Sequence, residues 1–174
     1  PVIDRGLEYL RKEQEPEGCW FGRWGTNYIY GTWSVLCAFN AAGVPHDDPA
    51  VLRAVRWLES VQRPDGGWGE DCASYEGGPP GEYKTSLPTQ TAWAVLGLMA
   101  VGRRDSEAVR RGIAYLVTVQ GEDGEWQEEP YNAVGFPKVF YLRYHGYKQF
   151  FPLMALSRFR NLGLSNAGRV EYGF

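Results

Sequence analysis

The chain repeats one short pattern three times along its length. Each copy reads Arg, a small residue, two variable residues, an aromatic residue and Leu, and after three more variable residues Gln-x-x-x-Gly-x-Trp. Self-similarity of this kind, with no insertion inside any copy, indicates a repeat architecture in which each unit buries its apolar face only against its neighbours. The motif residues are Gln14, Gly18 and Trp20 in the first copy, Gln62, Gly66 and Trp68 in the second, and Gln120, Gly124 and Trp126 in the third.

In each copy, the stretch from Arg to Gln is predicted to be a helix, and the stretch from Gln to Trp is predicted to be the turn that ends it at the Gly. Asp48-Pro49 and Asp105-Ser106 precede two of these helices and are typical of helix starts. Trp covers the turn and the Gln amide bonds a neighbouring helix end, so we interpret the pair as a clip between successive helices. The second copy shows the spacing of three and four that a helix packing on one face requires, with apolar residues at Val51, Ala54, Val55, Leu58 and Val61.

Apolar segments separate the repeats, at residues 28–42, 89–101 and about 150–161. The middle segment is apolar on all sides, which is typical of a helix buried on every face. Alternation of amphipathic and apolar helices predicts an all-α chain in two layers, with the apolar helices inside, that curves into all or part of an α/α barrel (toroid). No segment shows strand periodicity, and residues 1–174 are predicted to form a single domain.

Composition excludes several classes of protein. With 18 Lys+Arg, 21 Asp+Glu and no basic cluster, the chain offers nucleic acid little electrostatic attraction. Two His and three widely spaced cysteines (Cys19, Cys37 and Cys72) give no metal-ligand spacing, so no metal or cofactor is predicted, and the thiols are expected to be buried in a reducing compartment. Aromatic residues make up 15% of the chain, more than packing requires, and point to a function for their rings.

The repeat resembles the Gln-Trp motif of the triterpene cyclases, and the chain is most similar to the bacterial squalene–hopene cyclases. Residues 20–32 (WFGRWGTNYIYGT) and 135–142 (GFPKVFYL) resemble the C-terminal active-site wall of that family. The resemblance covers essentially the whole chain and implies a cofactor-free isomerase that folds squalene into a pentacyclic hopanoid through carbocations. It implies that the residues that line the cavity and stabilise the cations are Trp24, Tyr30, Phe136, Phe140, Leu142, Tyr144 and Tyr147.

Aromatic rings suit such a wall because the face of a ring attracts a cation without bonding to it. Each desolvated contact contributes roughly 0.5–2 kcal/mol, and several fixed rings together stabilise charge where it develops. The spacing of Phe136, Phe140, Tyr144 and Tyr147 also fits one face of a helix, so we expect these four to share a helical face.

The same resemblance shows what is missing. Members of the family are several times longer and begin the reaction with an Asp-x-Asp-Asp acid, whereas this sequence has only Asp47-Asp48. No catalytic residue is therefore assigned here, and the chain is expected to be the C-terminal part of the barrel domain of a longer cyclase and to be inactive alone. Its cut edges are expected to cause self-association. The complete protein is expected in the bacterial cytoplasm, peripheral on the inner membrane.

Three other interpretations deserve comparison. An oxidosqualene cyclase fragment would share these motifs, and a helical-repeat module could present the same concave apolar face to a ligand without catalysis. A protein prenyltransferase β-subunit would need Asp, Cys and His zinc ligands; Cys72 follows Asp71, but neither His46 nor His145 lies in a matching context. We interpret Glu70-Asp71 as a loop or cap cluster and the three motif tryptophans as structural.

Overall fold

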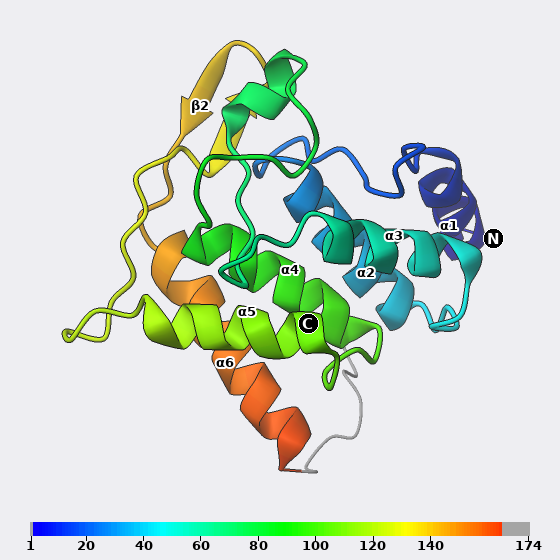
Figure 1. Cartoon of the computed structure of the whole chain (residues 1–174). Coiled ribbons are helices and arrows are strands. Elements are labelled where there is room, and N and C mark those ends of the chain that lie inside the picture. Colours follow the sequence, from blue (N-terminus) through cyan, green and yellow to red (C-terminus); the bar gives the residue numbers. More distant parts are fainter. Residues whose placement is uncertain (1, 165–174) are drawn as a thin grey trace.

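The computed structural model describes residues 2–164, so residue 1 and residues 165–174 of the predicted domain lie outside the described part. Figure 1 shows a helical molecule with one small hairpin at its edge. The elements are α1 (Val2–Lys12), α2 (Tyr28–Ala41), α3 (Pro49–Ser60), the short 3-10 helix η1 (Cys72–Glu76), α4 (Pro88–Ala100), α5 (Glu107–Thr118), β1 (Ala133–Phe136), β2 (Phe140–Leu142) and α6 (Tyr147–Gly163).

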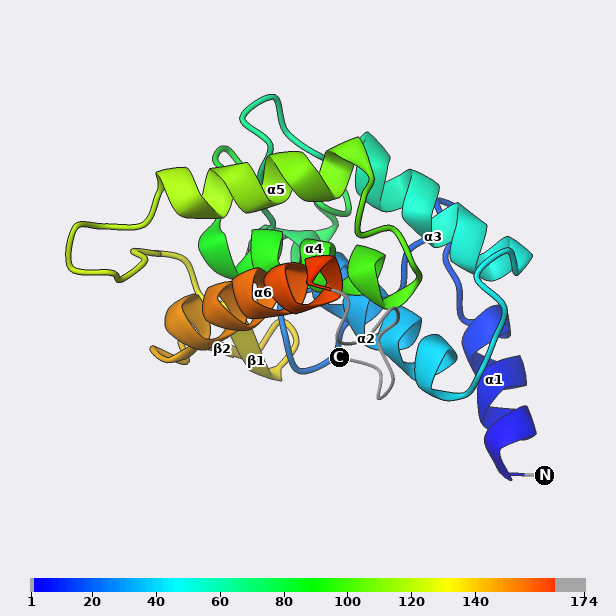
Figure 2. The ribbon, with the colours of Figure 1, turned by 90° about the horizontal axis from the view of Figure 1, so that it is seen from below.

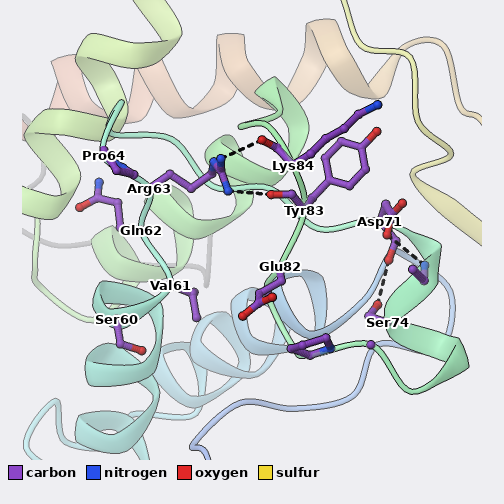
Figure 3. Close-up of a pocket in the computed structure, with 14 residues that line it drawn as sticks. Ser60, Val61, Gln62, Arg63, Pro64, Asp71, Ser74, Glu82, Tyr83 and Lys84 are labelled. Carbon is purple, nitrogen blue, oxygen red and sulfur yellow. Dashed lines mark hydrogen bonds between the residues drawn. The ribbon is translucent and has the colours of Figure 1, made fainter.

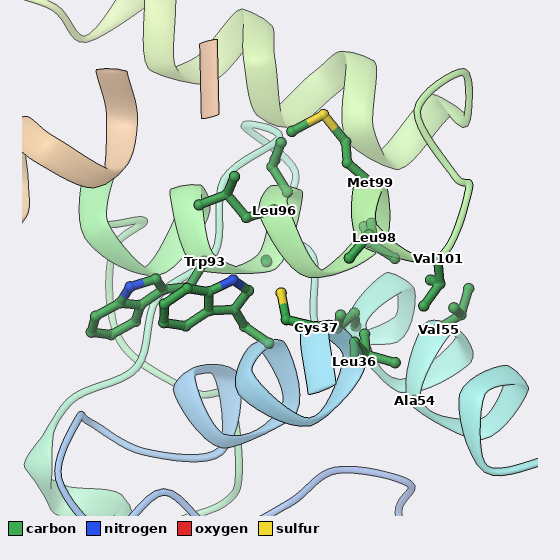
Figure 4. Close-up of a cluster of buried hydrophobic side chains, with 14 of the residues drawn as sticks. Leu36, Cys37, Ala54, Val55, Trp93, Leu96, Leu98, Met99 and Val101 are labelled. Carbon is green, nitrogen blue, oxygen red and sulfur yellow. The ribbon is translucent and has the colours of Figure 1, made fainter. Parts of the chain in front are cut away.

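The helices form two layers, as the alternating pattern predicts. Figure 2 shows α3 and α5 on one side, α2, α4 and α6 beneath them, and α1 at one end. Helix α4 lies between α2 and α6, and all 13 of its residues are buried. Figure 4 shows the resulting core, in which Trp93 and Leu98 of α4 lie toward Leu36 and Cys37 of α2.

The second and third repeat helices begin where the caps predict, but all three repeat helices end earlier than expected. Asp48 accepts a hydrogen bond from Ala50 N, and Ser106 accepts one from Val109 N, so both cap the helices that follow. The helices end at Lys12, Ser60 and Thr118, before the motif Gln and not at the motif Gly. The reason is that the carbonyls of Leu10, Leu58 and Leu116, which a further helical turn would use, accept the indole N–H of Trp20, Trp68 and Trp126.

The expectation that no strand would occur is wrong for residues 133–142. Strands β1 and β2 pair antiparallel, with Ala133 opposite Leu142 and an irregularity between Val134 and Phe136. The shared helical face predicted for Phe136, Phe140, Tyr144 and Tyr147 is therefore also wrong, because these residues lie in β1, in β2, in the following loop and at the start of α6. Pro137, which lacks a backbone donor, and Lys138, with φ of 66°, form the turn that prevents a helix here.

Candidate active-site wall

The motif glutamines join successive outer helices. Gln14 Nε2 donates to Gly18 O in its own turn, at 2.8 Å, and to Ala50 O in the first turn of α3, at 2.9 Å. Gln62 repeats both bonds at the same distances, to Gly66 O and to Ala108 O of α5. This geometry is that of a clip between one helix and the next.

The motif glycines allow the close approach that each clip needs. A Cβ on Gly18 would lie 2.7 Å from Arg53 O, and one on Gly66 would lie 2.7 Å from Arg111 O. Both glycines also have positive φ, 106° and 90°, which side chains rarely adopt. The backbone of the next outer helix therefore packs directly against the glycine.

The third motif makes only the first of the two hydrogen bonds of a clip among the described residues. Gln120 Nε2 donates to Gly124 O at 2.8 Å, but no bond to another helix is made among the described residues. A Cβ on Gly124 would meet nothing closer than Gln120 Nε2, at 3.9 Å. Among residues 2–164, nothing covers the corner that would receive a further outer helix.

Two buried glutamates support the inner helices: Glu70, which the sequence places in a loop or cap cluster, and Glu128, which no sequence pattern singled out. Glu70 Oε2 accepts from Ile29 N at 2.9 Å and Asn27 N at 3.3 Å at the start of α2, and its other oxygen accepts from Gly81 N. Glu128 Oε2 accepts from Thr89 N at 2.8 Å at the start of α4. Each glutamate stands two residues after a motif Trp, a regularity visible in the second and third copies of the repeat.

Burial raises the pKa of both glutamates above their ordinary range, opposed by the backbone hydrogen bonds they accept. Asp71 accepts from Ala73 N and caps η1, so the adjacent acids act as caps of two different elements.

A pH-dependent stability follows from the raised pKa of Glu70. The folded state holds this proton more tightly than the unfolded state, so the stabilisation is complete below the unfolded pKa, about 4.5, and is lost as pH rises through the folded value. Glu70→Gln removes this dependence. We expect the unfolding free energy of the chain to fall relative to that of Glu70→Gln as pH rises from about 4 to about 8. Urea titrations of both proteins measure the difference, and a constant or rising difference would contradict the assignment.

The cysteines provide no nucleophile near the rings. Cys19 and Cys37 are buried, and burial raises the pKa of each thiol to about 12. Cys72 is only half-buried, contrary to expectation, but burial still raises its pKa to about 11. All three thiols are therefore protonated near neutral pH, the form that reacts poorly with electrophiles.

The predicted wall residues gather into two groups near the start of the inner helices. In the first, Trp24 packs edge-on against Phe136 at 6.5 Å between ring centroids, and Phe136 against Phe140 at 5.9 Å. A bridge between Gly25 and Ala133 and the bond from Val134 N to Trp24 O, at 3.0 Å, hold these distant segments together.

The second group surrounds a buried tryptophan of α4. The Trp93 ring lies 5.1 Å from Tyr30 and 6.0 Å from Tyr147, and it stacks on Trp33 at 5.9 Å with an interplanar angle of 9°. Tyr147 in turn lies 4.9 Å from the ring of Tyr144. Rings from α2, α4, α6 and the loop before α6 thus form one continuous cluster.

Most of these rings are accessible. The exposed fractions are 54% for Trp24, 53% for Phe136, 45% for Phe140 and 47% for Tyr144. Tyr30, Leu142 and Tyr147 are half-buried. By contrast, Trp20, Trp68 and Trp126 are buried in the clips. The half-exposed rings are therefore available to line a cavity. The three motif tryptophans are buried and serve only in packing the clips.

The cavity drawn in Figure 3, of about 690 Å³, lies elsewhere, between the end of α3 and residues 78–84. Its lining includes Arg63, Asp71, Glu82 and Lys84. Arg63 is held there by bonds from its guanidinium to Tyr83 O and Lys84 O. A charged lining of this kind suits water and polar groups and is a poor site for a hydrocarbon.

Clipped outer helices around apolar inner helices, with accessible aromatic rings beside the inner helix starts, define part of a helical domain of the terpene-cyclase type. The chain belongs to the squalene-hopene cyclase C-terminal domain family, whose profile matches residues 1–161.

Sequence identity to individual proteins supports the same family assignment. The chain is 67% identical over 174 residues to a squalene-hopene cyclase of Schizosaccharomyces japonicus and covers 26% of that protein. It is 59% identical over 169 residues to the squalene--hopene cyclase of Bradyrhizobium diazoefficiens, with 97% of this chain and 26% of the relative covered. Lanosterol synthase of Mus musculus is 40% identical over 175 residues, which cover 97% of this chain and 24% of that enzyme.

A solved structure shows the same fold. The ent-copalyl diphosphate synthase from Streptomyces platensis aligns with a TM-score of 0.55 and 23% identity over 92% of this chain and 27% of its own. The chain thus spans about a quarter of the length of the curated relatives it matches.

Proposed function

We propose that the chain is the C-terminal part of the α/α barrel domain of a squalene–hopene cyclase, and that its aromatic rings form one wall of the cavity where squalene cyclises. The observation that carries this proposal is the joining of Trp24 to Phe136 and Phe140 through the Gly25–Ala133 bridge, which sets accessible rings from distant segments side by side. The family membership supplies the substrate class.

The chemistry fits what these residues offer. Cyclisation of a protonated polyene moves positive charge along the carbon skeleton, and a nucleophile would trap it. The rings at this wall attract a cation electrostatically without forming a bond, and their fixed packing makes the attraction available without reorganisation. The acid that begins the reaction is assigned to the remaining three quarters of the protein, because the sequence has no Asp-x-Asp-Asp motif.

A squalene substrate is favoured over oxidosqualene. The identities reported above are 67% and 59% to squalene–hopene cyclases and 40% to lanosterol synthase. A binding module without catalysis would explain the accessible rings but not this likeness to enzymes over the whole chain.

The activity test uses two proteins. The chain alone, incubated with squalene, is expected to give no cyclised product. A hybrid protein, in which this chain replaces the matching quarter of the Bradyrhizobium diazoefficiens enzyme, is expected to give hopene by gas chromatography with mass spectrometry. A folded hybrid without any cyclised product would contradict the proposed function, and hopene from the chain alone would contradict the assignment of the acid elsewhere.

Self-association of the isolated chain is a further expectation. The α6 residues Phe150 and Leu153 are 67% and 60% exposed, and the Gln120–Gly124 corner is open. In the complete barrel we propose that other helices cover both. Without them the chain is expected to sediment as a dimer or larger species and to bind an apolar dye. A monomer that binds no dye would contradict the proposal that other helices of the barrel normally cover these surfaces.

We place the complete protein in the bacterial cytoplasm, peripheral on the inner membrane, because squalene is apolar enough to reside in membranes. Among the described helices, none is long and apolar enough to cross a membrane. Membrane flotation of the complete protein tests this placement.

A further inference from the structure

Asn132 uses both polar atoms of its side chain on the main chain of Tyr144. Its Oδ1 accepts from Tyr144 N at 2.9 Å, and its Nδ2 donates to Tyr144 O at 3.3 Å. The side chain is buried, with 3% of the residue exposed, while the Tyr144 ring is half-exposed. A paired amide contact of this kind holds the peptide groups on both sides of the Tyr144 Cα, and so fixes the main chain from which the ring projects.

The backbone of Asn132 is fixed as well. Its N–H donates to Leu142 O and its carbonyl accepts from Thr26 N, each at 3.2 Å. Asn132 therefore lies where β1, β2 and the segment carrying Trp24 meet. The position of Tyr144 is tied to the same junction that brings Trp24 to Phe136.

Two inner helices begin beside this junction. Glu128, four residues before Asn132 in the chain, accepts from Thr89 N at the start of α4. Tyr144 O also accepts from Tyr147 N, at 3.0 Å, so the first turn of α6 begins on the carbonyl that Asn132 holds. The rings of Tyr144 and Tyr147 then lie 4.9 Å apart.

We propose that Asn132 is a positioning residue of the aromatic wall, which holds the ring of Tyr144 in place against the migrating charge by fixing the Tyr144 main chain to the junction of β1, β2 and the segment that carries Trp24. The inference rests on the proposed function. Asn132 itself is buried behind the main chain and acts on the reaction only through Tyr144.

The test is a double-mutant cycle in the hybrid protein. Asn132→Ala is expected to shift the ratio of incompletely cyclised products to hopene by about three- to tenfold, because a displaced ring stabilises the late charge less well. Gln127→Ala is the control, since it removes an exposed bond between the same chain segments, to Lys148 Nζ, without touching Tyr144. The control is expected to keep the unsubstituted ratio.

Combination with Tyr144→Ala separates positioning from general destabilisation. If Asn132 acts through the ring of Tyr144, Asn132→Ala adds no further shift in the product ratio once that ring is gone. Two shifts that multiply, or no shift from Asn132→Ala, would overturn the proposal. Asn132→Ser keeps a short uncharged polar side chain that can serve Tyr144 N or Tyr144 O but not both, so it is expected to give a smaller shift and serves if the Ala variant does not fold.

A measurement without turnover distinguishes this inference from the proposed function. Hydrogen exchange of the Tyr144 amide in the hybrid protein is expected to accelerate in Asn132→Ala and not in Gln127→Ala. Unchanged exchange overturns the positioning role, even if the hybrid cyclises squalene. Accelerated exchange in a hybrid that makes no product would leave the contact established and count against the proposed function alone.

Discussion

Replacement of Gly66 by Ala is expected to destabilise the chain by about 2–5 kcal/mol. The substituted residue would hold φ near 90°, which costs roughly 1–2 kcal/mol for a residue with a Cβ. The new methyl group would also lie 2.7 Å from Arg111 O, and relief of such overpacking in a close-packed region costs about 1–3 kcal/mol. Since Gln62 bonds Ala108 at the same place, any retreat of α5 would also lengthen the clip.

Gly124→Ala is the matched control for this prediction. Gly124 has a similar φ, 81°, and the same place in its motif, but its corner is open. It is expected to lose only the conformational part, about 1–2 kcal/mol. Urea unfolding of the two variants measures the difference, and equal losses would show that close approach of the helices does not stabilise the clip.

Much of the helical fold can be predicted from the sequence because its signals are local. The inner helices expected at 28–42 and 89–101 are found at Tyr28–Ala41 and Pro88–Ala100. The caps at Asp48 and Ser106 depend only on residue type and neighbouring backbone groups. The ends of the repeat helices are harder to predict. The indole N–H that donates to the Leu58 carbonyl belongs to Trp68, ten residues further along the chain.

The hairpin cannot be predicted from a local pattern, because its strands have only four and three residues and lack alternation of apolar and polar residues. Its formation depends on contacts between distant segments, chiefly the Gly25–Ala133 bridge, that no local pattern reveals. Gly135 also matters, since a Cβ there would overlap the Phe140 ring.

For the candidate site, the sequence predicts which aromatic residues belong to the wall better than it predicts how their rings are arranged. The sequence indicated which aromatic residues to consider, but their pairing follows from the tertiary bridge and from the bonds of Asn132. The buried glutamates look like surface acids by residue type alone. The signal that could have found them is their shared place two residues after a motif Trp.

The second large effect concerns positive charge at the wall. In the hybrid protein, Phe140→Leu keeps an apolar side chain but removes the ring that packs against Phe136. Loss of a cation–π contact worth about 0.5–2 kcal/mol is expected to weaken binding of a positively charged squalene analogue by roughly 2- to 30-fold. Binding of neutral squalene, which depends on apolar contact, is expected to change much less.

Tyr131→Leu serves as the control, because Tyr131 is a similarly exposed ring that lies beside Arg143 and is not assigned to the wall. This variant is expected to bind the charged analogue as the unsubstituted hybrid does.

The ratio of the two dissociation constants, for an ammonium-bearing squalene analogue and for squalene, is the most direct measurement of what these rings do. A wall that stabilises positive charge predicts that Phe140→Leu weakens binding of the ammonium compound selectively and that Tyr131→Leu leaves the ratio unchanged. Equal weakening of both ligands by Phe140→Leu, or no weakening of either, would show that the ring provides only apolar surface and would contradict a role in stabilising carbocations.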